Sequence, residues 1–187
     1  MLRVATAVLL LLATAAAGPA YRYQLDAAGS EVNAKVGFLG LASKTARFPR
    51  MSGAIRLSPD RLEAIDLDVL LDGRAITADD RLTQERLRGP QFFDVERHPA
   101  IGFNGQRMTM TGTTTALVDG ALTARGTTRP VRLAVAFDRP PAQASGRDPI
   151  GFIATTTIDR YQFGMTAYSL VVGRKVTITI KARMVPG

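Results

Sequence analysis

The sequence lacks cysteine and tryptophan, and its 187 residues include a single histidine, His98. Without cysteine the chain can form neither disulfides nor thiolate metal sites. It also has no cysteine nucleophile and no N-terminal cysteine for a lipid anchor. One histidine excludes a metal site built from several imidazoles. We therefore expect no metal and no redox or other cofactor.

The motifs of common enzyme classes are absent as well. There is no glycine-rich phosphate loop followed by Lys and Ser or Thr, and no GxSxG elbow. His98 lies in the segment ERHPA, between charged residues and a proline, which is typical of a surface turn. Asp66, Asp68 and Asp72 alternate with apolar residues, as on the wet face of a strand. The sequence therefore predicts that the protein is not an enzyme.

Positive charge exceeds negative charge, with 24 Lys and Arg against 16 Asp and Glu and a formal net charge of +8. Such a surplus is compatible with nucleic acid or with an anionic membrane surface as a partner. The arginines are scattered and are not clustered with stacking aromatic residues, so we expect no nucleic acid partner. A transient contact with an anionic membrane surface stays open.

Residues 1–20 have the pattern of a cleavable export signal. Arg3 precedes an uncharged apolar run from Val4 to Ala17, and small residues follow up to Ala20. The run of 14 residues is too short to span a bilayer as a helix and matches a secretory signal. We expect cleavage after Ala20, with Ala17 as the other site, and an uncleaved anchor as the alternative. Residues 21–187 then form one periplasmic domain.

Apolar and polar residues alternate in several segments of that domain. The alternation runs over residues 21–26, 31–38, 65–72 and 131–138, and it is clearest at Val176, Ile178, Ile180, Ala182 and Met184. A period of two predicts strands with one buried and one wet face. Repeated strands of this kind, joined by Gly, Pro and Asp turns, indicate an all-β domain built from an antiparallel barrel or sandwich.

Two segments depart from the alternation. Residues 78–89 are rich in helix formers, with two aspartates near the start and Gly89-Pro90 at the end, which predicts one short helix between strands. Residues 140–149, PPAQASGRDP, contain three prolines and are expected to form a flexible loop.

Four segments resemble motifs of the YceI-like family, the periplasmic lipocalin-like proteins known for binding polyisoprenoids. They are FLGLASKTARFPRMSGAIRL (38–57), FFDVERHPAIGF (92–103), DGALTARGTTRPVRL (119–133) and IDRYQFGM (158–165). Their order and spacing also match the family. The resemblance therefore extends over essentially all of residues 21–187.

This resemblance implies an antiparallel eight-stranded lipocalin-like barrel with one short inserted helix and an elongated apolar cavity. The implied function is a periplasmic carrier for an isoprenoid-type lipid, either a polyprenyl lipid or a quinone. The alternative is a barrel of this shape with a filled core, acting as an interaction or stress-related structural module without a ligand. The candidates for lining a cavity are the large inward-facing residues, namely Phe38, Leu41, Phe48, Phe92, Phe93, Phe103, Phe152, Phe163 and Met165.

Several polar positions of the family pattern are changed in this chain. Phe38 stands where the family has histidine, Ala42 replaces a serine, Arg86 a histidine and Gln162 an aspartate. We expect Phe38 to make the neck of the cavity apolar. The preference for a charged lipid head group should then be weakened.

Overall fold

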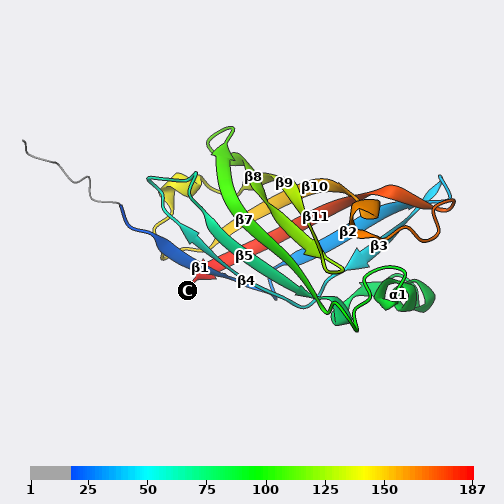
Figure 1. Ribbon diagram of the computed structural model, residues 1–187. Helices are drawn as coiled ribbons and strands as arrows, with labels where there is room; N and C mark the ends of the chain where they lie inside the picture. Colours follow the sequence, from blue (N-terminus) through cyan, green and yellow to red (C-terminus); the bar gives the residue numbers. More distant parts are fainter. Residues whose placement is uncertain (1–17) are drawn as a thin grey trace, which may run out of the picture.

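The computed structural model describes residues 18–187. Most of the expected export signal, residues 1–20, lies outside these described residues. The ordered part is an elongated β-structure with α1 beside one end (Figure 1). Within residues 18–187, no helix has the length and apolar character needed to cross a membrane.

The chain forms eleven strands between residues 18 and 187. They are β1 (Tyr21–Leu25), β2 (Glu31–Phe38), β3 (Ala42–Arg47), β4 (Met51–Leu57), β5 (Asp66–Asp72), β6 (Thr77–Ala78), β7 (Ala100–Met110), β8 (Thr115–Ala124), β9 (Thr127–Phe137), β10 (Ile150–Asp159) and β11 (Val172–Pro186). The helices are α1 (Arg81–Arg88) and the short 3₁₀ helices η1 (Gly73–Ala75), η2 (Pro141–Gln143) and η3 (Arg160–Phe163).

Eight of the strands close into a barrel. The hydrogen-bonded order runs β1-β4-β5-β7-β8-β9-β10-β11, and β11 pairs back with β1. Every pairing is antiparallel. The other three strands extend this sheet toward α1: β2 continues β1, β3 continues β4, and β6 continues β5, each after a short interruption. These three strands pair in the order β11-β2-β3-β6. The expected eight-stranded antiparallel barrel with one helix is confirmed.

The two ends of the barrel differ. At the β1 end the ring of hydrogen bonds is complete, because β1 joins β4 to β11. At the other end β6 pairs with β3 but not with β7, so the ring is interrupted there. Helix α1 follows β6 and lies beside this interrupted end (Figure 1).

Helix α1 is shorter than the predicted span of 78–89. The Asp80 side chain accepts a hydrogen bond of 2.8 Å from the Thr83 backbone N–H, so Asp80 caps the helix and the first helical residue is Arg81. The preceding residues Thr77–Ala78 are extended and pair with β3 as strand β6. The helix ends at Gly89, as the sequence predicts.

The loop expected over residues 140–149 contains η2 and packs on the closed end of the barrel. Pro141 is fully buried, and the Gly146 N–H donates a 3.0 Å hydrogen bond to the Tyr23 hydroxyl. Tyr23, Leu57, Met108 and Ile150 belong to the apolar core at this end. A second core cluster near α1 contains Phe48, Ile76, Phe92 and Phe163 among its buried residues.

Candidate functional site

A cavity occupies the interior of the barrel between the closed end and α1. The space open to the centre of a water-sized molecule is about 180 Å³, far above the roughly 10–15 Å³ that one water requires. Its lining comes from strands on all sides of the barrel and from Thr83 and Leu87 of α1. The interior is therefore not completely filled by side chains.

The lining is apolar almost throughout. Its polar side chains are those of Lys44, Thr45, Thr83, Thr156 and Arg160. An apolar cavity with a few polar groups is the usual composition of a pocket for a small hydrophobic ligand. No group of three or more His, Asp or Glu side chains suited to a metal ion occurs within residues 18–187.

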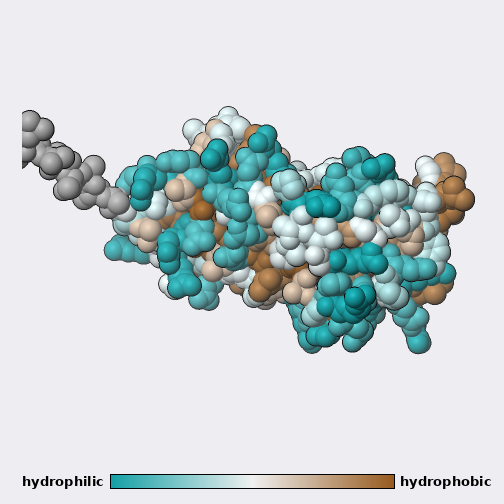
Figure 2. Space-filling view, in the orientation of Figure 1, coloured by the Kyte–Doolittle hydropathy of each residue, from teal (hydrophilic) through white to brown (hydrophobic). Residues whose placement is uncertain are grey.

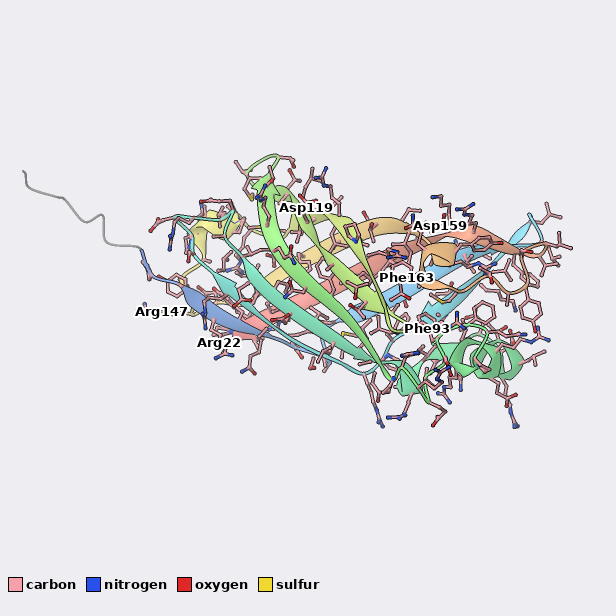
Figure 3. All side chains as sticks on the ribbon, viewed as in Figure 1. Arg22, Phe93, Asp119, Arg147, Asp159 and Phe163 are labelled. Atoms are coloured by element: carbon pink, nitrogen blue, oxygen red, sulfur yellow. The ribbon has the colours of Figure 1, made fainter. Side chains whose placement is uncertain are left out.

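Six of the nine sequence-predicted lining residues face this cavity: Phe48, Phe92, Phe93, Phe103, Phe152 and Met165. They come from separate parts of the chain, and the barrel brings them together. The rings of Phe48 and Phe93 meet edge to face, with 5.8 Å between their centroids. Figure 3 shows Phe93 at the end of the barrel next to α1. Whether these side chains bind a ligand stays a prediction.

The other three predicted residues do not line the cavity. Leu41 is completely exposed in the turn between β2 and β3, because the positive φ angles of Leu39 (53°) and Gly40 (71°) turn the chain outward before it. Phe163 is buried in the core cluster near α1, where neighbouring side chains surround it. Phe38 ends β2 beyond the last lining residue of that strand, Val36.

The position of Phe38 corrects the expectation that it forms the neck of the cavity. Its ring lies 5.5 Å from Lys44 Nζ, measured to the ring centroid, in a cation–π contact. The ammonium group of Lys44 thus covers the ring. Phe38 therefore does not line the cavity itself, although Lys44 and the strand partner of Phe38, Val172, do.

Many lining residues are aliphatic and were not among the candidates. They include Val32 and Val36 of β2, Val69 and Leu71 of β5, and Ile178 and Ile180 of β11. The period-two alternation already placed most of them on inward faces. The choice of candidates by side-chain size overlooked them, although a cavity wall in a barrel needs inward residues from every strand.

Arg160 is the one buried arginine at the cavity. It is 3% exposed, and its guanidinium donates hydrogen bonds to three backbone carbonyl oxygens, those of Met165, Val172 and Gly173. Burial lowers the pKa of Arg160 from its usual value. Arg160 therefore fixes the segment between η3 and β11, which contributes Met165 and Val172 to the lining.

Asp159 holds the start of the same segment. Its carboxylate accepts a hydrogen bond from the Tyr161 N–H and lies 2.6 Å from Arg174 Nε. Burial by itself raises the pKa of Asp159, but the Tyr161 N–H and the Arg174 guanidinium outweigh it, so the pKa is lowered. Within the motif IDRYQFGM, the polar contacts of Asp159 and Arg160 therefore hold in place a segment that lines the cavity.

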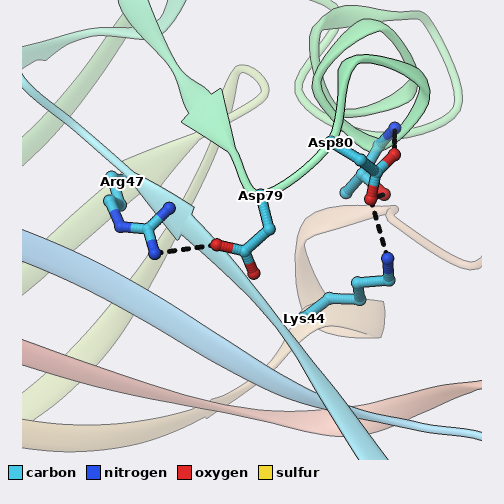
Figure 4. A network of polar contacts seen from close by, with 5 residues as sticks. Lys44, Arg47, Asp79 and Asp80 are labelled. Atoms are coloured by element: carbon cyan, nitrogen blue, oxygen red, sulfur yellow. Dashed lines mark hydrogen bonds and ion pairs between the residues drawn. The ribbon is translucent and has the colours of Figure 1, made fainter.

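Two ion pairs join β3 to the residues at the start of α1 (Figure 4). Lys44 Nζ lies 2.7 Å from Asp80 Oδ2, and Arg47 Nη2 lies 2.8 Å from Asp79 Oδ1. Hydrogen bonds from Lys44 and Thr83 hold the pKa of Asp80 well below its usual range. We call these two pairs the helix latch. They fix α1, which supplies Thr83 and Leu87 to the cavity lining.

Comparisons with known proteins agree with this architecture. The barrel superposes on Burkholderia cenocepacia BcnA with a TM-score of 0.76 and 19% identity, over 85% of this chain and 98% of that one. A polyisoprenoid binding domain from Saccharophagus degradans, implicated in plant cell wall breakdown, matches with a TM-score of 0.67 and 14% identity, covering 88% of this chain and 98% of its own.

The sequence comparison supports the same relationship. A UPF0312 protein of Vibrio vulnificus is 26% identical over 164 residues, which are 87% of each chain. The model of the YceI-like domain matches residues 23–184, which is nearly all of the barrel. The chain belongs to the YceI-like family.

Proposed function

We propose that this protein binds an isoprenoid-type lipid, a polyprenyl lipid or a quinone, in the barrel cavity and carries it through the periplasm. The observation that carries the proposal is the apolar space of about 180 Å³ inside a closed barrel. The similarity in fold to the polyisoprenoid binding domain of Saccharophagus degradans supports it. The pattern of residues 1–20 supports export to the periplasm.

An isoprenoid tail suits this lining because it presents carbon and hydrogen only. Each methylene group transferred from water to an apolar wall contributes about 0.8 kcal/mol. Ten buried carbons therefore contribute roughly 8 kcal/mol, before the loss of translational and rotational freedom is subtracted. The walls need no hydrogen-bonding groups to hold such a tail.

The polar groups at the cavity favour a head group of low charge. Lys44 is paired with Asp80, and the guanidinium of Arg160 is engaged with three carbonyl oxygens. Neither cation is free to neutralise a diphosphate without giving up these contacts. A quinone or a polyprenol requires only one or two hydrogen bonds, which Thr45 or Thr156 can offer from the lining, while the Thr83 hydroxyl already donates to Asp80.

The test is lipid extraction and native mass spectrometry of the protein purified from its own periplasm. Ala34→Phe places a phenyl ring in the cavity, because Ala34 lines it from β2. The matched control is Ala134→Phe, which adds the same ring at an exposed position of β9.

We expect wild type and Ala134→Phe to carry a co-purifying isoprenoid lipid and Ala34→Phe to carry much less. Equal lipid content in all three proteins would overturn the cavity as the binding site. A folded wild type without any lipid, which also fails to take up added polyprenol or quinone, would favour the alternative of a structural module.

A further inference from the structure

Four exposed apolar side chains gather at the α1 end of the barrel. They lie in two loops: Leu39 and Leu41 between β2 and β3, and Tyr168 and Leu170 between η3 and β11. Leu41 is 100% exposed, Leu170 98%, Leu39 60% and Tyr168 41%. We call these four residues the leucine tip. Figure 2 shows apolar surface at the corresponding end of the molecule.

The two loops are held together by the backbone. The Leu39 N–H donates a 2.8 Å hydrogen bond to the Val171 carbonyl oxygen, and Phe38 pairs with Val172 where the strands begin to join. The two loops that carry the leucine tip therefore lie side by side.

Turn geometry does not account for the residue types at the tip. Leu39 and Tyr168 adopt left-handed backbone conformations, with φ of 53° and 55°. Gly, Asn and Asp are the residues that normally occupy such positions, and bulky side chains are uncommon there. Polar residues would fit both positions and would not leave apolar surface in water, so the apolar side chains indicate a contact made outside the chain.

Positive charge exceeds negative charge around the tip. The two loops with their flanking strands, residues 33–48 and 159–176, contain six Lys and Arg. Of these, Lys44 and Arg47 are paired with Asp80 and Asp79, and Arg160 is buried; the acidic residue within the two ranges is Asp159. Asp159 is buried and bridged by Arg174. The Arg86 guanidinium of α1 lies 5.1 Å from the centroid of the Tyr168 ring and adds to this charge. Such an arrangement is complementary to the surface of an anionic bilayer. The apolar side chains can enter the hydrocarbon region, and the cations behind them can contact the anionic head groups.

The tip also adjoins the cavity. The Tyr168 ring stacks on the Phe92 ring, with 6.0 Å between centroids and 10° between planes. Phe92 and the neighbouring Val172 both line the cavity. A lipid that leaves the cavity beside α1 would therefore emerge next to the leucine tip.

We propose that the leucine tip inserts into the surface of an anionic phospholipid bilayer and orients the barrel with its α1 end toward the membrane. This inference rests on the proposed function for its purpose, which is exchange of the bound lipid with the bilayer. The tyrosine lies at the head-group level, where amphipathic rings are favoured, while the three leucines reach the boundary of the acyl chains.

The test is flotation with vesicles of equal parts phosphatidylglycerol and phosphatidylcholine, compared with vesicles of phosphatidylcholine alone. The variant combines Leu39→Asn, Leu41→Ser and Leu170→Ser. Asparagine suits the left-handed conformation at residue 39. The matched control combines Leu70→Ser and Ile153→Ser, which are 55% and 51% exposed on strands β5 and β10, away from the tip.

We expect wild type and control to float with the anionic vesicles and much less with the neutral ones. Burial of one leucine changes partitioning by about tenfold or more, so the triple variant should bind about a hundredfold more weakly or worse. Equal flotation of variant and control would overturn the inference. The inference would also be overturned if sedimentation velocity showed that the wild type self-associates through the tip and if its binding to vesicles did not depend on the leucines.

A second measurement separates this inference from the proposed function. Polyprenol is delivered from cyclodextrin, without vesicles, and its uptake into the protein is followed. Normal uptake by a wild type that ignores anionic vesicles would overturn docking and leave lipid binding intact. Vesicle binding that depends on the leucines, without uptake of polyprenol, would support docking and argue against the carrier role.

Discussion

Replacing Arg160 with methionine should lower the melting temperature by roughly 6–12 °C. Methionine retains an unbranched side chain of similar reach for packing against the Phe92 and Tyr161 rings, which lie 5.9 and 4.9 Å from the guanidinium carbon. It removes the three hydrogen bonds to the carbonyl oxygens of residues 165, 172 and 173. The change therefore tests the polar clamp with little change in volume.

The magnitude follows from opposing contributions. Hydrogen bonds from a charged donor contribute about 1.5–3 kcal/mol each, so three amount to roughly 5–9 kcal/mol. The variant no longer has to remove a guanidinium from water, which offsets several kcal/mol. We expect a net loss of about 3 kcal/mol in the free energy of unfolding. For a domain of this size, 1 kcal/mol corresponds to about 2–4 °C.

The assay is thermal unfolding followed by circular dichroism, alongside retention of bound lipid. The control is Arg132→Met, because the pair between Arg132 and Asp119 is exposed to solvent and screened, and its loss should barely change the melting temperature. Lipid retention should fall in Arg160→Met only, since Met165 and Val172 of the clamped segment line the cavity. A melting temperature within about 2 °C of wild type would refute the clamp.

Three further predictions concern the helix latch, the surface phenylalanine and the N-terminus. The pKa of Asp80 is lowered in the folded protein by Lys44 and Thr83, so its stabilising effect is complete at neutral pH and is lost as the pH falls below about 3.9. The difference in melting temperature between wild type and Asp80→Asn should shrink over that acid range, and a constant difference would contradict the assignment. Because Phe38 lies outside the cavity lining, Phe38→His should leave the ratio of affinities for polyprenyl phosphate and polyprenol unchanged in a binding titration. We also expect export with cleavage after Ala20, so N-terminal sequencing of protein recovered from the periplasm should begin at Tyr21, and a sequence beginning at Met1 would contradict cleavage.

The alternation of apolar and polar residues predicted the strands well, because a strand with one buried and one exposed face requires apolar and polar side chains in turn. Along β11 the side chains of Val176, Ile178 and Ile180 face inward and the threonines between them face out. Helix α1 begins at Arg81, three residues later than predicted, because the Asp80 carboxylate caps it there. Such a shift depends on one side-chain hydrogen bond, which composition does not reveal.

The cavity was less predictable because side-chain size and direction are different properties. Side-chain size marked Phe38 and Leu41 as candidates, but both lie at the hairpin end where the strands leave the barrel. Phe163 faces inward, yet its neighbours fill the space around it. Which inward-facing residues border an empty space depends on how the complete set of side chains packs, and this is a property of the closed barrel rather than of any one strand.

The same strands contribute both to the packed core and to the wall of the cavity. Strand β11 is an example. All four inward residues Ile178, Ile180, Ala182 and Met184 border the cavity, but Ala182 and Met184 toward the closed end are buried, while Ile178 and Ile180 nearer α1 are only half-buried. An unfilled space forgoes packing contacts and therefore lowers the free energy of unfolding. Tyr23 and the surrounding core at the closed end supply that stability elsewhere, through complete burial and a ring of strands without an interruption. The α1 end can therefore keep an apolar space beside α1, which is joined to β3 by ion pairs that are exposed to solvent and contribute little to stability.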